Sequence, residues 1–171
     1  MTAKTPYKVL FLCTHNSSRS ILAEGIANNH TSGRFEAYSA GSTPSTSPNP
    51  FALALLPENH IAVDGVRSKN WDEFAVPGAP KFDFIFTVCD DAAGEMCPMW
   101  PGHPSKAHWG IPDPSAVHGS DDVKRKAFLT AFLQLRKRID LLASLPLDTL
   151  DQLALKEQIQ NIGTTLRERG E

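Results

Sequence analysis

Short apolar runs alternate with longer stretches of helical character along the chain. The runs at 8–12, 35–39 and 82–88 are typical of short strands, and the first is apolar almost throughout, as in strands buried on both faces. We expect a fourth strand at 106–109. Apolar spacing and flanking residues predict helices at the following segments: 20–30, 50–58, 69–74, with Ser68 as its cap, 121–143 and 148–167.

Strands that alternate with helices predict an α/β fold, in which a parallel sheet is covered on both faces. In such sheets, ligands bind beyond the carboxyl ends of the strands. Cys13 directly follows the strand at 8–12, Cys89 directly follows the strand at 82–88, and Asp113 comes a few residues after 106–109. If these strands are neighbours, the three side chains converge on one edge of the sheet.

Composition narrows the class of protein. The chain has 171 residues, of which 41% are hydrophobic and 21% charged, as expected of one globular domain. A net charge of −2 without long runs of one sign argues against nucleic-acid and membrane-surface binding. The apolar run near the N-terminus is too short for a signal peptide or a membrane span, so we expect a cytoplasmic protein with reduced thiols. Its three cysteines, an odd number, argue against a structural disulfide framework.

The segment CTHNSSRS, which starts at Cys13, joins the first strand to the first helix. A small polar loop at this place points backbone N–H groups and the positive end of the helix at one spot, which suits an oxyanion. Arg19 adds a two-pronged donor, and the same donors lower the pKa of the Cys13 thiol. Ser20 can donate a further hydrogen bond to the sulfur. The expected anion-binding residues are Thr14, His15, Asn16, Ser17, Ser18 and Arg19. The alternative is a buried cysteine beside a capping loop.

Three further segments follow in order: YSAGS, TVCDDAAGEMCP and HWGIPDP. Together with CTHNSSRS they resemble the low-molecular-weight protein tyrosine phosphatases and, more closely, the arsenate reductases that share their fold. The resemblance covers 7–143 and implies a three-layer sandwich around a four-stranded parallel sheet. It also implies that Cys13 is the nucleophile, Arg19 the oxyanion binder and Asp113 the general acid. Asn16 and Ser20 match positions that fix the loop and stabilise the thiolate.

The reductase branch implies arsenic detoxification: arsenate is reduced to arsenite, and phosphate or sulfate can mimic the substrate. Reduction needs two electrons and therefore a second thiol, which Cys89 supplies by attacking Cys13; Cys97 then takes over the disulfide. The Cys89–Cys97 spacing is one residue longer than in the arsenate reductases that this sequence resembles. An external dithiol protein, thioredoxin or glutaredoxin, would reduce the pair, and no metal or bound cofactor is expected.

Two other functions remain open at this point. One is a phosphatase, although Ser115 and its neighbours stand where those enzymes carry paired tyrosines. The other is an oxyanion-binding or redox-sensing module without turnover, against which Arg19 and Asp113 argue, since sensing needs no proton donor.

Two regions depart from the pattern. Residues 146–171 would extend the domain at 1–145 with a helix whose apolar stripe packs on its own domain or pairs with a second copy, giving a monomer or a homodimer. Some of these reductases bind potassium through residues equivalent to Asn16, Glu24, Ser39 and an aspartate. Lys69 stands in place of the aspartate here, so its ammonium group would occupy that site and pair with Glu24, or else point into solvent.

Overall fold

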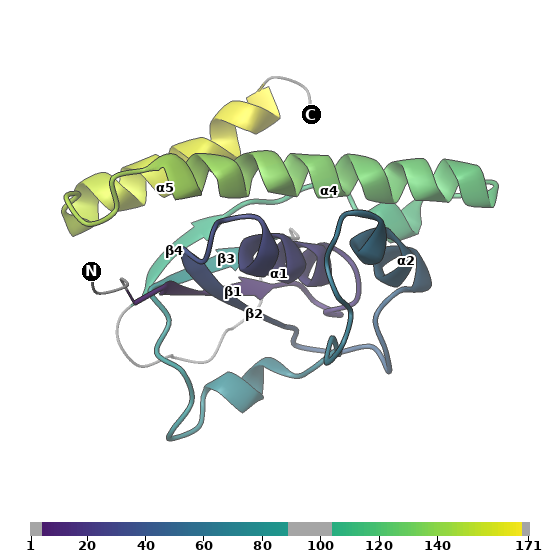
Figure 1. Cartoon of the computed structure of the whole chain (residues 1–171), viewed down its shortest axis with the longest axis horizontal. Coiled ribbons are helices and arrows are strands. Elements are labelled where there is room, and N and C mark those ends of the chain that lie inside the picture. Colours follow the sequence, from purple (N-terminus) through teal and green to yellow (C-terminus); the bar gives the residue numbers. More distant parts are fainter. Residues whose placement is uncertain (1–4, 89–103, 169–171) are drawn as a thin grey trace.

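The computed structural model describes residues 5–88 and 104–168, and a four-stranded parallel sheet lies at their centre (Figure 1). Its strands are β1 (Tyr7–Leu12), β2 (Phe35–Ala40), β3 (Phe84–Thr87) and β4 (Ser105–His108), in the order β2-β1-β3-β4. Every neighbouring pair is parallel, as predicted. The carboxyl ends of all four strands therefore share one edge of the sheet.

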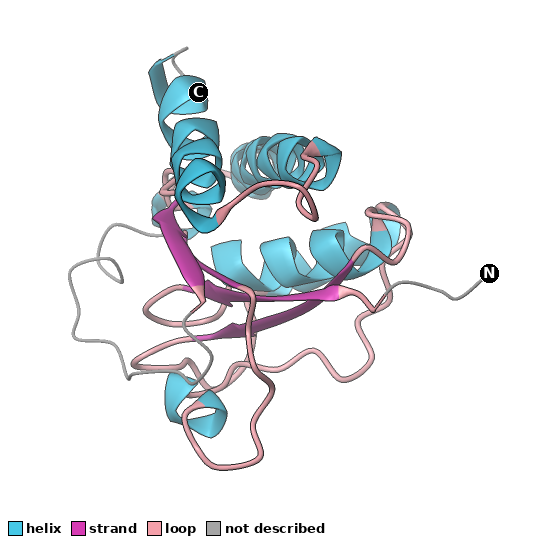
Figure 2. Ribbon diagram, turned by 90° about the vertical axis from the view of Figure 1, so that its left-hand side faces the viewer, coloured by secondary structure: helices cyan, strands magenta, loops and turns pink. Residues whose placement is uncertain are grey.

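Both faces of the sheet are covered (Figure 2). One face packs against α1 (Arg19–Asn29), α4 (Asp121–Ser144) and α5 (Gln152–Glu168), with α2 (Pro50–Glu58) beside them. The other face packs against a 3₁₀ turn, η1 (Trp71–Phe74). A second 3₁₀ turn, η2 (Pro114–Ala116), follows β4. The expected α/β sandwich with a parallel sheet is confirmed.

Alternate residues of the central strands face opposite layers, although most of them are buried. Val9 and Phe11 of β1 belong to the cluster beneath the long helices, whereas Leu10 and Leu12 pack with Trp71 near η1. Burial on both faces is the reason why the last four residues of β1 form a continuous apolar run.

The predicted helix at 69–74 is wrong in type and start. The segment forms the 3₁₀ turn η1, which begins at Trp71. Asn70 caps this turn by accepting a hydrogen bond from the Asp72 N–H at 2.8 Å. Ser68 is therefore not the cap, and its hydroxyl is buried without a hydrogen-bond partner among the described residues.

The C-terminal helix α5 packs on its own domain. Ile159 and Ile162 are buried in the same cluster as the core of the sheet, and α5 contacts β4. This part of the apolar stripe is thus covered within the chain and is not exposed for pairing with a second copy. The boundary between the domain at 1–145 and the extension at 146–171 stays a prediction. No described helix has both the length and the apolar character required to cross a membrane.

Candidate active site

The segment from Cys13 to Ser20 turns from the end of β1 into α1, at the carboxyl edge of the sheet. Cys13 is buried, with 6% of its surface exposed, and its N–H donates to the carbonyl of Ala40 at 3.2 Å. Cys13 is thus held where the loop leaves β1, next to the end of β2.

The carbonyl groups of this loop are occupied by the segment at 43–49. Three of them accept a backbone hydrogen bond at 2.9 Å: Thr14 from Thr43, His15 from Ser45 and Ser17 from Asn49. In a planar trans peptide, the N–H of the next residue points away from the carbonyl. Because the carbonyls face the outer segment, the N–H groups that follow them face the inside of the loop. These N–H groups thus face away from the segment at 43–49, which is the arrangement that a loop needs in order to surround an oxyanion.

Asn16 fixes the shape of the loop. Its φ of 47° lies in the left-handed region, which asparagine tolerates better than most residues. Its fully buried side chain donates to the Ser20 hydroxyl at 2.8 Å and accepts from the Lys69 N–H at 2.9 Å. Since Ser20 accepts this bond, its own hydroxyl proton is available to another acceptor.

Gly41 lets the chain after β2 pass directly over the loop. A Cβ atom at this position would lie 2.4 Å from the Thr14 carbonyl oxygen and 2.5 Å from that of Cys13. Such distances are far below contact distance, and both neighbours are backbone atoms that cannot rotate away. Only glycine fits this approach.

Arg19 and Asp113 meet at the edge of the loop. Nη1 of Arg19 donates to the carbonyl of Ile111 at 2.9 Å, and Nη2 lies 3.5 Å from Oδ2 of Asp113. Oδ1 of Asp113 accepts from both the N–H and the hydroxyl of Ser115, at 2.9 and 2.7 Å. The carboxyl group is thereby anchored at the start of η2, with its second oxygen turned toward the guanidinium.

Two polar atoms of this loop are buried without a partner among the described residues. They are Nε of Arg19 and the hydroxyl oxygen of Ser18. Burying a charged donor without a hydrogen-bond partner is costly, and a residue that keeps such a donor usually has a ligand to bond it.

The side chain of His15, by contrast, is exposed. Its Nδ1 lies 3.0 Å from the Thr43 carbonyl, so it ties the loop to the segment at 43–49.

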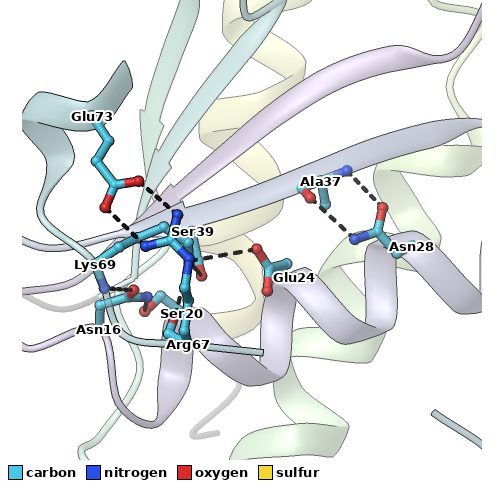
Figure 3. A network of polar contacts seen from close by, with 9 residues as sticks. All are labelled: Asn16, Ser20, Glu24, Asn28, Ala37, Ser39, Arg67, Lys69 and Glu73. Carbon is cyan, nitrogen blue, oxygen red and sulfur yellow. Dashed lines mark hydrogen bonds and ion pairs between the residues drawn. The ribbon is translucent and has the colours of Figure 1, made fainter. Parts of the chain in front are cut away.

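Lys69 enters a buried polar network beneath the loop (Figure 3). Its Nζ lies 3.9 Å from Oε1 of Glu24, 3.5 Å from the Ser39 hydroxyl and 2.9 Å from the Arg67 carbonyl. Both side chains of the ion pair are mostly buried, with 8% of Lys69 and 16% of Glu24 exposed. The predicted pairing of Lys69 with Glu24 is confirmed, and the solvent-facing alternative is excluded.

Burial opposes the charged forms of this pair. Loss of solvation raises the pKa of Glu24, and the positive charge of Lys69 and a hydrogen bond from Ser39 pull it back down. Loss of solvation likewise lowers the pKa of Lys69, and the charge of Glu24 opposes that change. Each charge therefore depends on the other for its stability. A two-pronged pair between Arg67 and Glu73, at 2.9 and 2.6 Å, holds the segment of chain that supplies the Arg67 carbonyl.

The structure thus brings together Cys13, the loop at 14–18, Arg19 and Asp113, as the sequence predicted. Cys89 and Cys97 lie outside the described residues, so their predicted convergence on this edge stays a prediction. Among residues 5–88 and 104–168, no group of three or more histidine, cysteine, aspartate or glutamate side chains is arranged to hold a metal ion.

Three contributors to the site are not identified by the sequence patterns. Gly41 stands inside YSAGS without a signal of its own, the Ser- and Pro-rich segment at 43–49 has the composition of an ordinary loop, and the Ile111 carbonyl belongs to the main chain. A glycine directly after a strand, next to a polar segment, is the one available indication of a close backbone approach.

Comparisons with known proteins agree with this geometry. The family model for low molecular weight phosphotyrosine protein phosphatases matches residues 8–157. An arsenate reductase of Bacillus licheniformis is 36% identical over 139 residues, which cover 81% of this chain and 94% of the relative.

Solved structures give the same result. An arsenate reductase in a phosphate-binding state is 28% identical with a TM-score of 0.64, and the match covers 81% of this chain and 97% of the other. A low-molecular-weight protein tyrosine phosphatase from T. tengcongensis is 25% identical with a TM-score of 0.59, covering 78% and 95%. The cysteine loop, its arginine and the aspartate after β4 therefore stand in a known setting: the chain belongs to the low-molecular-weight phosphotyrosine protein phosphatase family, among relatives that include arsenate reductases.

Proposed function

We propose that this protein reduces arsenate to arsenite. The observation that carries the proposal is the meeting of Arg19 and Asp113 beside a buried cysteine whose loop directs N–H donors inward. An arsenate seated there would accept hydrogen bonds from these donors and from Nε of Arg19, which is otherwise buried without a partner among the described residues. The 36% identity to an arsenate reductase supports the choice of substrate.

In the first step, the Cys13 thiolate attacks arsenic and a sulfur–arsenic bond forms. One arsenic–oxygen bond breaks, and Asp113 donates a proton so that the oxygen leaves as water. The loop N–H groups and Arg19 balance the negative charge on the remaining oxygens. The hydroxyl of Ser20 accepts a hydrogen bond from Asn16. It donates a hydrogen bond of its own to the sulfur of Cys13 and so stabilises the thiolate.

In the second step, the Cys89 thiolate attacks the sulfur of Cys13. The sulfur–arsenic bond breaks, its electron pair stays on arsenic, and arsenite leaves as arsenic(III). Cys13 and Cys89 have together lost two electrons to arsenic and are left joined in a disulfide. Cys97 then attacks Cys89, releases Cys13 and leaves a Cys89–Cys97 disulfide, which an external dithiol protein reduces. Thioredoxin is the partner we propose, with glutaredoxin as the alternative.

A phosphatase activity is less well supported. The loop has no means of separating phosphate from arsenate, because the two ions share shape and charge. However, Ser115 bonds the carboxylate of Asp113 at the place where the resemblance expects the first of two tyrosines. A phosphotyrosine ring would therefore lack the aromatic contact that this tyrosine pair supplies in the phosphatases.

The test is arsenate-dependent NADPH consumption with two coupling systems supplied separately. One contains thioredoxin and its reductase, and the other contains glutaredoxin, glutathione and glutathione reductase. Hydrolysis of p-nitrophenyl phosphate by the same preparation is measured in parallel. We expect turnover with arsenate in the thioredoxin system. Phosphate-ester hydrolysis without arsenate turnover in either system would overturn the proposal.

A further inference from the structure

The helix α5 contacts the segment that carries Asp113. Trp109 directly follows β4 and is fully buried (Figure 1 shows α5 beside this strand). Its indole Nε1 donates to the carbonyl of Ile159, in the middle of α5, at 2.7 Å. The indole ring also stacks on Phe86 of β3, with ring centroids 3.8 Å apart and planes 18° from parallel. Trp109 therefore links the helix to the sheet.

A second contact on α5 is made by backbone against backbone. A Cβ atom on Gly163 would lie 2.8 Å from the carbonyl oxygen of His108 and 2.9 Å from Cδ1 of Trp109. Glycine in a helix interior lowers helical propensity, so its presence needs a compensating reason. The reason here is that the helix backbone rests directly on the end of β4.

The contacted residues lead directly into the site. The N–H of Trp109 donates to the Thr87 carbonyl at 2.7 Å, and the N–H of Ile111 donates to that of Val88 at 3.4 Å. The carbonyl of Ile111 then binds Arg19, and Asp113 follows two residues later. Gly110 lies between Trp109 and Ile111, and the two backbone hydrogen bonds on either side of it hold this part of the chain against the neighbouring strand. Pro112 and Pro114 then restrict the backbone on either side of Asp113.

We propose that α5 positions the catalytic acid, with Trp109 and Gly163 as the positioning residues. The helix sets the position of the 109–113 segment relative to the sheet and thereby the placement of the Asp113 carboxyl. This inference rests on the proposed function, because it concerns the step in which Asp113 gives its proton. The competing interpretation is that α5 only covers apolar surface; that role predicts lower stability but no specific change in catalysis.

Gly163→Ala and Trp109→Phe test the two contacts separately. The first introduces the Cβ that meets His108 and Trp109. The second removes the indole donor to Ile159 and keeps an aromatic ring to stack on Phe86. Asn161→Ala is the matched control, because this residue is exposed on the same helix, two positions from Gly163, and also changes to alanine.

Three quantities are measured on the full chain: the single-turnover rate of arsenate reduction against arsenate concentration, the affinity for inorganic phosphate, and amide hydrogen exchange in 105–117. We expect both variants to exchange faster in this segment. Their maximal single-turnover rate should fall roughly 10- to 100-fold, with phosphate affinity and half-saturating arsenate within about twofold of wild type. The Asn161→Ala control should match wild type in all three.

Two results would overturn the inference. One is an unchanged maximal rate in both variants. The other is a parallel fall of rate and phosphate affinity, which marks a general loosening of the loop. If Gly163→Ala does not fold, Trp109→Phe is judged by the same criteria.

The outcome is separable from that of the proposed function. Should the wild-type protein not reduce arsenate, hydrolysis of p-nitrophenyl phosphate needs the same nucleophile, arginine and acid. The rate comparison is then made with that reaction, and the hydrogen-exchange readout requires no activity at all.

Discussion

Oδ2 of Asp113 lies 3.5 Å from Nη2 of Arg19, although 93 positions of sequence separate the two residues. The guanidinium is mostly buried, with 13% of the side chain exposed, whereas 37% of the Asp113 side chain is exposed. The proposed anion-binding group and the proposed general acid thus lie side by side, the first mostly buried and the second more exposed. This arrangement suits a leaving oxygen that points outward.

Replacing Asp113 with asparagine should slow the chemical step. The amide keeps the size of the side chain and its contact with Ser115 but has no proton of suitable acidity to give. We expect the single-turnover rate to fall by about 10²–10⁴, the usual range for a lost general acid. Phosphate binding, measured by calorimetry, should change little. An unchanged rate would show that the proton comes from another group.

Replacing Cys89 with serine should stop the reaction once Cys13 has attacked arsenate. Attack of Cys13 on arsenate remains possible, but no second thiol releases arsenite, so a single equivalent of arsenate is consumed. Slow hydrolysis of p-nitrophenyl phosphate should survive because it needs no second thiol. Cys13→Ser is the matched control: both reactions should drop below about one per cent of wild type, since a hydroxyl is a far weaker nucleophile than a thiolate. Full multiple turnover by Cys89→Ser would mean that an external thiol resolves Cys13 directly.

Replacing Gly41 with alanine should damage both stability and anion binding. The added Cβ overlaps the carbonyl oxygens of Thr14 and Cys13, so the backbone of the loop must move. We expect a loss of about 1–3 kcal/mol in the free energy of unfolding, as is typical of overpacking. Urea denaturation measures this, and phosphate affinity should fall with it. Gly65→Ala is a useful comparison, because a Cβ there would meet no atom within 4 Å, so any loss of stability comes from its positive φ of 78° and not from a clash.

Replacing Lys69 with alanine should leave Glu24 as an uncompensated buried acid. We expect the free energy of unfolding to fall by about 1–3 kcal/mol at neutral pH, as measured by urea denaturation. Lys8→Ala, which breaks a surface pair with Glu36, should cost only about 0–1 kcal/mol.

The loss should also depend on pH in a defined direction. Burial already raises the pKa of Glu24, and removing the positive charge raises it further. A raised pKa in the folded state means that the folded protein retains a proton which the unfolded chain releases. Stability is then lost as the pH rises through the folded pKa. The variant should therefore be closer to wild type at about pH 4 than at about pH 7, and adding Glu24→Gln should remove this difference.

Potassium should not stimulate the enzyme. The ammonium group of Lys69 already contacts Ser39, Glu24 and the Arg67 carbonyl, so a monovalent cation has no reason to bind among these oxygens. The half-saturating arsenate concentration should be the same in sodium and potassium chloride at constant ionic strength. A clear potassium stimulation would contradict the assignment of Lys69 to this position.

Much of the fold could be predicted because β1 and the long helices carry strong local patterns. The run at 8–12 is apolar except for Lys8, and the helix predicted at 121–143 differs from α4 by one residue. The pattern failed where the tertiary environment decides. Leu129 and Leu133 fit the helical spacing of α4 but are 41% and 53% exposed, because each lies one position beyond the buried face of the helix.

The groups of the candidate site also differ in whether the sequence could predict them. Cys13, Arg19 and Asp113 were predictable because their chemistry resides in side chains at strand ends. The Ile111 carbonyl and the backbone braces from 43–49 were not, since a main-chain group is identical at every position and only the folded path reveals its role. The pairing of Lys69 with Glu24 was found from a departure at one position of a known ligand set.

The bracing of the loop by 43–49 has a consequence in phosphate-rich surroundings. Because the backbone hydrogen bonds from 43–49 hold the loop in place, little ordering is required on binding, and we expect an oxyanion of the right size to bind without further selection. Phosphate must then compete with arsenate for the same loop, and the fraction of loops that hold arsenate follows the ratio of the two ion concentrations. Discrimination is left to the steps after capture, because only arsenic takes up two electrons from thiols. An enzyme of this design is selective in its product and unselective in its binding.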